Sequence, residues 1–426
     1  MTLCFADILT SFDIVQETET ASASVFVFGR LRSGVIPNVH GDDVVLKLSL
    51  ASTEDNNSLE IERKIYMYIH NKIVPESPHL LEGLYESECT DTAIVAYNTS
   101  KDPAERSLFK TWQKLRMKVL MKTFSEQEQK DMRSKTRELY GKYNTENLML
   151  AYKIILPPTK VYFIVTQKMS GIPLRVLLSD PKTKMELSET DLMEIILQVA
   201  QALAVLEFHK INHHDVHYGN IFVDVLATPR KITYSNFPKP TSGQTPYSIT
   251  SRYFVTLFDF DNASGAGLVN TFLTHHRCQQ VAMCNEFVSN FDWFRFLGQF
   301  RQYWERQGMA VPPRVMDLFH HGDDVAQGDP WFASNFCEIE DEQEETGCKQ
   351  SRLKLDLLHA IPSPETFFRE NVNTYMHPTT TQNAKPVSLS AQTPTMKMQH
   401  RARSTSSVGK RSASRSSRRS SVSRRK

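Results

Sequence analysis

The sequence contains no apolar run that approaches the 18 or so residues of a membrane-spanning helix. Residues 1–7 lack the basic start that is typical of a secretory signal peptide. The six cysteines are scattered without the spacing of a disulfide framework, which favours a reducing compartment. These absences predict an intracellular protein that neither spans nor enters a membrane.

Acidic residues are absent from the end of the chain, where residues 401–426 contain ten Lys or Arg and ten Ser. Such a segment cannot bury a core, so we expect residues 378–426 to be disordered. The charge of +10 on residues 401–426 leaves about −8 on the remainder, because the whole chain carries +2. The alternatives are a basic arm that contacts nucleic acid or chromatin, a nuclear localisation signal, or a solubility tail without a partner.

The most informative pattern is a polar segment that starts at His213 and has the form H-x-D-x-x-x-x-N, with Asp215 and Asn220 in the last two places. A second apolar run ends at Asp259. In protein kinases, the Asp of this loop orients and deprotonates the substrate hydroxyl, while the Asn and the second Asp hold Mg²⁺. The pattern predicts Asp215 as catalytic base with His213 beside it in the catalytic set, and Asn220 and Asp259 as metal ligands.

The context of this segment matches the same chemistry. Upstream, apolar residues at spacings of three and four over 192–206 predict a helix, and Ser188 begins a plausible capping box. Downstream, residues 221–223 and 253–258 are predicted strands. The order of helix, loop, strand, strand and Asp is that of the helical lobe of a kinase.

The N-terminal half supplies a candidate phosphate-binding lysine. Lys47 is the one charged residue of an apolar strand over 44–48, as in the V-A-I-K strand of kinases. A predicted helix over 58–70 follows, and either Glu60 or Glu62 is placed to pair with Lys47. We favour Glu62 because the apolar residues after it would pack its helix on the sheet.

Residues 161–169 form an apolar strand that runs into a polar turn before Gly171. This pattern is typical of the segment that joins the two lobes and contacts adenine. It makes Thr166, Gln167 and Met169 candidate ATP-binding residues, with Thr166 near the gatekeeper position.

A glycine-rich phosphate loop is missing. The segment before the first predicted hairpin, residues 20–24, reads Thr-Ala-Ser-Ala-Ser, and no glycine occurs until Gly29. Glycine permits close approach of the backbone to phosphates, and Ala and Ser do so less freely. The absence keeps a catalytically weak pseudokinase scaffold open as an alternative.

Within the kinases, the segment from His213 to Asn220 resembles the haspin family, which also carries His two residues after the catalytic Asp, here His217. Residues 231–258 look like the inserted hairpin of haspin-like kinases, and no A-P-E triplet precedes residues 290–294. In this resemblance Asp292 corresponds to the helix Asp that anchors the catalytic loop. The resemblance covers roughly residues 20–300 and implies a serine/threonine protein kinase that uses ATP and Mg²⁺, with a histone-like or otherwise basic protein as substrate.

Two departures leave another class open. His214 stands where haspin has Arg, so control through phosphorylation of the activation segment is not expected. Asp261 replaces the glycine of D-F-G and is similar to an acidic residue in small-molecule phosphotransferases of the aminoglycoside and choline kinase type. The chain also looks like kinases of large DNA viruses, which would place it in the nucleus or cytoplasm of a host cell or in a virion.

The predicted fold class is α+β, with the two lobes of a protein kinase. We expect an N-lobe over residues 1–165 with a basic helical insert at 100–143, a mainly helical C-lobe over 166–377, and a tail over 378–426. The acidic run 338–345 is either a solvated loop or a docking segment for basic substrates. A zinc site at residues 275–284 is disfavoured, because the His and Cys spacing there is not a recognised one.

Overall fold

The computed structural model describes these residues, together with a few single positions between them: 12–18, 24–32, 43–50, 58–90, 101–108, 160–179, 187–239, 245–270, 285–307, 313–318 and 361–372. Its contacts divide the chain into two units, Met1–Pro378 and Thr379–Lys426. Within the described residues, no helix is both long enough and apolar enough to cross a membrane.

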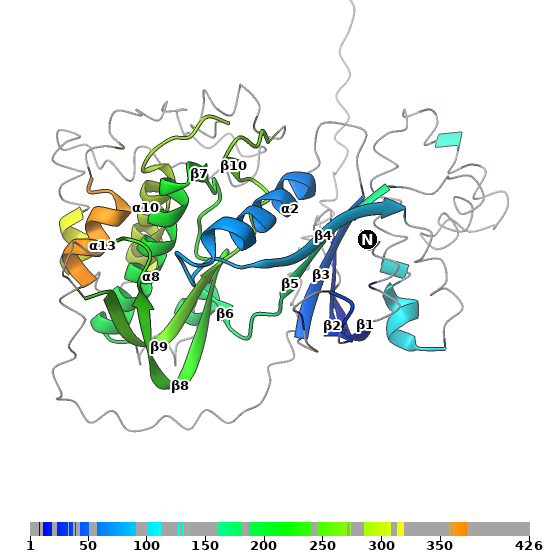
Figure 1. Cartoon of the computed structure of the whole chain (residues 1–426), viewed down its shortest axis with the longest axis horizontal. Coiled ribbons are helices and arrows are strands. Elements are labelled where there is room, and N and C mark those ends of the chain that lie inside the picture. Colours follow the sequence, from blue (N-terminus) through cyan, green and yellow to red (C-terminus); the bar gives the residue numbers. More distant parts are fainter. Residues whose placement is uncertain are drawn as a thin grey trace, which may run out of the picture. The chain divides into compact units, whose positions relative to one another are not determined.

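The first part of the chain forms one antiparallel sheet of five strands in the order β1-β2-β3-β5-β4 (Figure 1). The strands are β1 (Phe12–Thr18), β2 (Ser24–Leu31), β3 (Asp43–Leu50), β4 (Gly83–Thr90) and β5 (Lys160–Gln167). Alternate residues of β3 and β5 are buried in one core on the outer face, among them Leu46 and Phe163. Because successive side chains of a strand point to opposite faces, Lys47 faces the other side of the sheet.

Helix α2 (Ser58–Tyr68) packs on that other side and continues into a π-helical turn, η1 (Ile69–Ile73). The helix predicted over 58–70 is therefore confirmed in position, but its α-helical part ends at Tyr68 and the π-helical turn follows. Ile61, Ile65 and Ile69 lie on one face at spacings of four and are buried. This burial turns Glu62 toward the sheet, where it is also buried.

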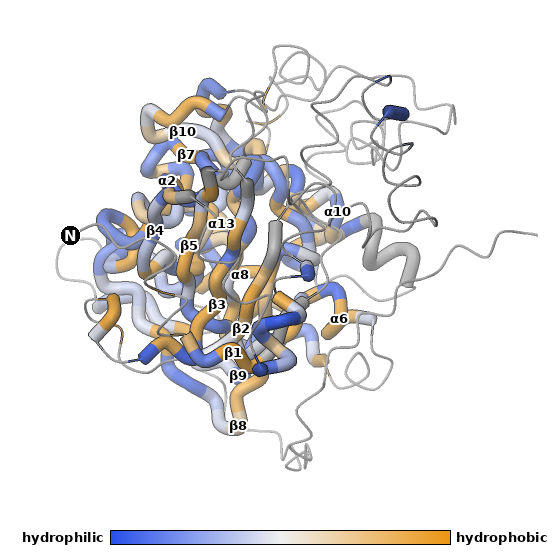
Figure 2. The backbone as a smooth tube through the Cα atoms, turned by 90° about the vertical axis from the view of Figure 1, so that its right-hand side faces the viewer, coloured by the Kyte–Doolittle hydropathy of each residue, from blue (hydrophilic) through white to orange (hydrophobic). Residues whose placement is uncertain are grey.

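Helix α8 (Glu189–Phe208) runs through the core of the second part of the chain (Figure 2). It begins with the predicted capping box, since the Ser188 side chain accepts from the Asp191 N–H and the Asp191 carboxylate accepts from the Ser188 N–H. The other helices of this part are α6 (Leu174–Ser179), α10 (Phe291–Gln307) and α13 (Pro364–Val372). Two short strands, β7 (Ile211–Asn212) and β10 (Ser264–Gly265), pair with each other beside the catalytic segment.

The predicted insertion is a hairpin, formed by β8 (Ile221–Tyr234) and β9 (Tyr247–Leu257), with β6 (Ile172–Pro173) beside β8. The short strands predicted on either side of the insertion are continuous with it. Tyr234 pairs with Tyr247 at one end, and Ile221 pairs with Leu257 at the other. In the end formed by Ile221 and Leu257, Ile221 directly follows Asn220 and Leu257 lies two residues before Asp259, so the hairpin fixes both positions.

A buried segment after η1 connects the first sheet to the hairpin. His79 is fully buried, with Nδ1 2.9 Å from the Val255 carbonyl oxygen and Nε2 2.8 Å from the Tyr234 hydroxyl. The Leu81 N–H donates to the Leu257 carbonyl at 3.0 Å. The chain that leaves α2 is thereby fastened to the hairpin that leads to Asp259.

Several predicted features lie wholly or largely outside the described residues. They are the segment 20–23, the candidate zinc residues at 275–284, the acidic run 338–345 and the tail 378–426. Of the insert predicted over 100–143, residues 103–108 are helical, and most of the remainder is not described. Cys89 in β4 is disulfide-bonded, which the spacing of the cysteines did not predict.

Candidate active site

Lys47 connects the first sheet to the catalytic segments. Its Nζ lies 2.5 Å from Oε2 of Glu62 and 3.3 Å from Oδ1 of Asp259. The structure thus brings together a strand lysine, a helix glutamate and an aspartate that is 212 residues away in sequence. Glu60, the alternative partner, instead bonds Lys64 at 2.8 Å.

The pKa values of this ion pair reflect its burial. Burial alone would lower the pKa of Lys47, but the carboxylates of Glu62, Asp259 and Asp261 together raise it above its ordinary value. Burial raises the pKa of Glu62 to about 8, and the Lys47 ammonium opposes that rise. Lys47 therefore stays charged at neutral pH, and its ammonium offsets only part of the cost of ionising the buried Glu62 carboxyl.

Asp292, near the start of α10, binds the backbone of the loop formed by residues 213–220. Its Oδ2 accepts from the His213 N–H at 2.6 Å, and its Oδ1 accepts from the His214 N–H at 2.8 Å. These bonds hold His214 in the left-handed region with a φ of 62°. This strained backbone turns the next residue, Asp215, toward the site.

The buried His213 side chain stabilises the same loop through hydrogen bonds to two backbone groups. Its Nδ1 accepts from the Asp215 N–H at 3.3 Å, so Nε2 carries the proton and donates to the Phe258 carbonyl at 3.0 Å. The side chain is fully buried and its ring packs against that of Phe260. His213, predicted among the catalytic residues, accordingly has a positioning role between the loop and the segment of Asp259.

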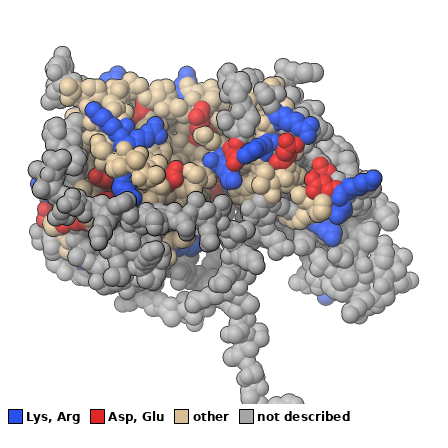
Figure 3. Space-filling view, turned by 90° about the horizontal axis from the view of Figure 1, so that it is seen from below, with Lys and Arg blue, Asp and Glu red and all other residues tan. Residues whose placement is uncertain are grey.

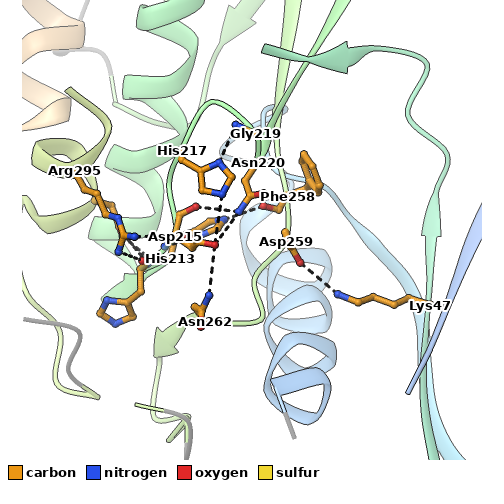
Figure 4. A network of polar contacts seen from close by, with 12 residues as sticks. Lys47, His213, Asp215, His217, Gly219, Asn220, Phe258, Asp259, Asn262 and Arg295 are labelled. Carbon is orange, nitrogen blue, oxygen red and sulfur yellow. Dashed lines mark hydrogen bonds and ion pairs between the residues drawn. The ribbon is translucent and has the colours of Figure 1, made fainter. Parts of the chain in front are cut away.

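Asp215 lies at the centre of a network of polar contacts (Figure 4). Asn220 Nδ2 lies 3.2 Å from its Oδ2, and Asn262 Nδ2 lies 3.5 Å from the same atom. On the other oxygen, Oδ1, Arg295 of α10 lies 3.5 Å away and also donates to the His214 carbonyl. The carboxylate is held by these donors and keeps 24% of its side chain exposed, so it is accessible to a ligand.

Asp259 is held in place by a residue of α2. Its backbone has a φ of 68°, and its N–H donates to the Tyr66 hydroxyl at 3.1 Å. The Tyr66 ring packs edge-on against Phe260, 5.3 Å between centroids. Phe260 is fully buried between Tyr66 and His213, so helix α2 and the catalytic loop together set the orientation of Asp259.

The donor set beside Asp215 fits a hard cation. Asn220 and Asp259 could supply oxygen ligands, and Mg²⁺ is usually bound by few protein ligands plus water and phosphates. Oδ1 of Asp261 is buried without a hydrogen-bond partner, and burial raises the pKa of this carboxyl to about 6, with Asp259 adding to the rise. Among the described residues, no group of three or more His, Cys, Asp or Glu forms a self-sufficient metal cage. These oxygen ligands suit a metal ion that binds together with phosphate groups.

The predicted adenine-contacting residues lie at the end of β5. Thr166 is buried and pairs with Val45 of β3, while Gln167 is the last residue of the strand and exposed. Met169 follows in the extended segment that leads to β6 and is partly buried against the main core. These positions are at the connection between the first sheet and the part rich in helices, and their contact with adenine stays a prediction.

Three residues of the site were not predicted from the sequence: Tyr66, Asn262 and Arg295. Arg295 follows Asp292 by three positions, which places both on one face of a helix. That spacing was a usable signal once Asp292 was recognised as an anchor. Tyr66 and Asn262 carried no comparable signal.

Charged side chains of both signs alternate on the described part of the face seen in Figure 3. That view therefore shows no surface of a single sign that would select a strongly basic or acidic partner.

Comparison with known proteins gives one family match. The model of the protein tyrosine and serine/threonine kinase family matches residues 104–237, which include Asp215 and Asn220 but neither Lys47 nor Asp259. No curated protein matches the chain. A crystal structure of a kinase domain has 10% sequence identity and a TM-score of 0.35, with 68% of this chain and 64% of that chain covered.

The chain thus spans somewhat less than two thirds of the length of that solved kinase domain. The family match concerns the catalytic loop and the strands around it, and the structure adds a β-sheet lobe before a region rich in helices. Together these findings show a similarity to a protein kinase family model over residues 104–237, in a chain that folds into a β-sheet followed by a part rich in helices.

Proposed function

We propose that this protein is an ATP-dependent kinase that transfers the γ-phosphate of Mg-ATP to serine or threonine hydroxyls of proteins. The observation that carries the proposal is the ion pair of Lys47 with Glu62, which reaches Asp259 across 3.3 Å while Asp215 and Asn220 contact each other beside it. Phosphoryl transfer needs a cation on the phosphates, ligands for a metal and a base at the hydroxyl.

In this mechanism the substrate hydroxyl donates its proton to Asp215 while its oxygen forms a bond to the γ-phosphorus. The bond from that phosphorus to the bridging oxygen breaks, and ADP carries away the electron pair. Lys47, held by Glu62, binds phosphate oxygens. Asn220 and Asp259 would hold Mg²⁺, which would supply neutralisation of the charge on the phosphates. Positioning and electrostatic stabilisation provide most of the rate.

We further propose a haspin-like kinase, on the strength of His217 and of the long β8–β9 hairpin that lies between Asn220 and Asp259. The basic segment 401–426 would serve as an arm for nucleic acid or chromatin, with a basic or histone-like protein as substrate. We propose that the protein is located in the nucleus or cytoplasm of a host cell or in a virion.

The test is phosphate transfer from radiolabelled ATP with Mg²⁺ by the full chain. The acceptors are histones, casein, myelin basic protein, choline and an aminoglycoside. Asp215→Asn is the matched variant, because it keeps the size of the side chain and one acceptor oxygen but removes the base. We expect label on protein serine or threonine, with a loss of about 10³-fold in the variant.

Other outcomes select other functions. Label on a small molecule alone would move the assignment to the aminoglycoside and choline kinase type, for which Asp261 is the relevant residue. ATP binding without transfer to any acceptor would contradict the kinase proposal and favour a scaffold. Equal transfer by the wild type and by Asp215→Asn would remove the base role from Asp215.

A further inference from the structure

Arg295 extends from helix α10 to the loop of residues 213–220 and contacts it with both terminal nitrogens of its guanidinium group. Nη1 donates to the His214 carbonyl, and Nη2 lies 3.5 Å from Oδ1 of Asp215 (Figure 4). These two acceptors belong to consecutive residues. The planar guanidinium group offers several donors in a fixed fork and can bind both acceptors at once, whereas a lysine presents a single nitrogen.

Helix α10 binds both backbone groups of His214. Oδ1 of Asp292 accepts from the His214 N–H at 2.8 Å, and Arg295 binds the His214 carbonyl. Asp292 and Arg295 are three positions apart, which places them on one face of the helix. Because the backbone of His214 has a φ of 62°, a conformation that costs energy, these two bonds oppose its relaxation. They thereby fix the direction in which the chain continues to Asp215.

The carboxylate of Asp215 is contacted at both oxygens. Asn220 and Asn262 approach Oδ2, at 3.2 Å and 3.5 Å, and Arg295 approaches Oδ1. Donors on both oxygens oppose rotation of the carboxylate about its Cβ–Cγ bond. Both members of the Arg295–Asp215 ion pair are largely buried, so salt screens their attraction less than that of an exposed pair.

The residue directly before the base supplies no permanent charge. The His214 side chain is fully buried, its Nε2 lies 2.8 Å from the Ser264 hydroxyl oxygen, and its ring packs against Phe291. Arg295, by contrast, is charged at every accessible pH. The permanent positive charge that the Asp215 carboxylate contacts therefore comes from α10 and not from its own loop.

We propose that Arg295 is a positioning residue for Asp215, which fixes the plane of the carboxylate and the strained backbone before it. The inference rests on the proposed kinase function and goes beyond it, since it gives helix α10 a direct part in orienting the base. A misplaced base slows proton removal from the acceptor. Nucleotide binding should not change, because Arg295 contacts the loop at Asp215 whereas the proposed phosphate ligand is Lys47.

Steady-state kinetics with the full chain test this role. We expect Arg295→Met to lower kcat by about 10²-fold with KM for ATP unchanged. Arg295→Lys keeps the charge but not the fork and should recover part of that loss. In Asp215→Asn, which lacks the base, Arg295→Met should have no more than about a twofold further effect, because it acts through the carboxylate. Arg32→Met, which breaks an exposed ion pair with Asp13, is the matched control and should leave kcat unchanged.

Chemical rescue separates the guanidinium group from a general effect on the helix. In Arg295→Ala, guanidinium chloride at millimolar concentration, far below that which denatures proteins, should restore part of kcat. Ammonium chloride at the same concentration supplies a cation without the planar fork and should not. An equal response to the two salts would overturn the role of the fork.

A kcat for Arg295→Met within twofold of the wild type would overturn the proposal, and so would an equal fold-loss in the wild type and in Asp215→Asn. Urea unfolding of the full chain tests the ion pair without activity. Arg295→Met should lower the unfolding midpoint more in the wild type than in Asp215→Ala, and equal shifts would show that the pair is not formed. Absence of transfer by the wild type overturns the kinase proposal itself, which the unfolding result does not address.

Discussion

At the scale of single residues, the ion pair of Lys47 and Glu62 makes a prediction about stability as well as activity. Lys47→Met removes the charge that favours the ionised form of Glu62, and breaking a buried pair costs roughly 3 to 5 kcal/mol when the remaining charge persists. The folded pKa of Glu62 is about 8 beside Lys47, above its unfolded value of 4.5, and loss of Lys47 raises it further, so Glu62 can escape this cost by taking up a proton. The folded state then binds more protons than the unfolded state.

We therefore expect Lys47→Met to be less stable at pH 9 than at pH 6, relative to the wild type. A carboxyl with a raised folded pKa contributes stability below its unfolded pKa, and this contribution is lost as the pH rises through the folded pKa. Urea unfolding at both pH values measures the difference, with Lys47→Met/Glu62→Gln as the control that should show none. A double variant with the same pH response would mean that Glu62 is not the titrating group.

At the scale of elements, Gln198 joins helix α8 to strand β9. Its Nε2 donates to the Tyr253 carbonyl at 2.9 Å, and its Oε1 accepts from the Val255 N–H at 3.0 Å. The side chain is fully buried. Gln198→Leu would leave both backbone groups without this partner, at about 1 to 3 kcal/mol each.

We expect Gln198→Leu to lower the free energy of unfolding by roughly 2 to 4 kcal/mol in urea denaturation. Gln198→Glu retains an acceptor for the Val255 N–H and should be less destabilising at a pH at which the carboxyl is protonated. A loss below about 0.5 kcal/mol in Gln198→Leu, the range of neutral surface substitutions, would show that α8 and β9 do not depend on this bridge.

The elements that the sequence predicted are those with a strong local pattern. The strands of Lys47 and of Thr166, the capping box at Ser188 and the hairpin after Asn220 all follow from apolar spacing and turn residues. The π-helical turn after Tyr68 was missed, because it depends on packing and not on local propensity.

The polar residues of the site were likewise predictable only where a local sequence pattern identifies them. Lys47, Glu62, Asp215, Asn220 and Asp259 were recognisable because known chemistry requires each at a given place in the chain. The Tyr66 hydroxyl and the Arg295 guanidinium act on backbone and carboxylate atoms far away in sequence. No spacing rule connects positions that meet only through the packing of α2 and α10.

At the scale of the whole Met1–Pro378 unit, buried His79 gives stability a dependence on pH. Burial lowers its pKa to about 4 from an unfolded value of 6.5. The unfolded chain then binds more protons between these values, so stability is lost as the pH falls from 6.5 to 4, by roughly 3 kcal/mol. Glu194, with a pKa that burial raises to about 7, has the opposite effect between pH 4.5 and 7.

We accordingly expect the acid sensitivity of His79 to be clearest in Glu194→Gln. Thermal unfolding of this variant between pH 7 and 4 should show a steady fall in stability that is smaller in Glu194→Gln/His79→Asn. An equal fall in the two variants would assign the acid sensitivity to other groups. Because His79 is buried where the first sheet is attached to the hairpin, burial of a charged ring there would destabilise this attachment.

The acidic character of the site also determines the order in which ligands can arrive. Among the described residues, the carboxyl groups of Asp215, Asp259 and Asp261 lie near Lys47 and Arg295, while burial raises the pKa of Glu62 to about 8, so three acidic groups face two cations. A bare polyanion entering this field would be repelled, and a polyanion already paired with a divalent cation would not. In the proposed reaction the nucleotide and its cation would therefore enter as one species, and substrate inhibition by metal-free nucleotide would be weak.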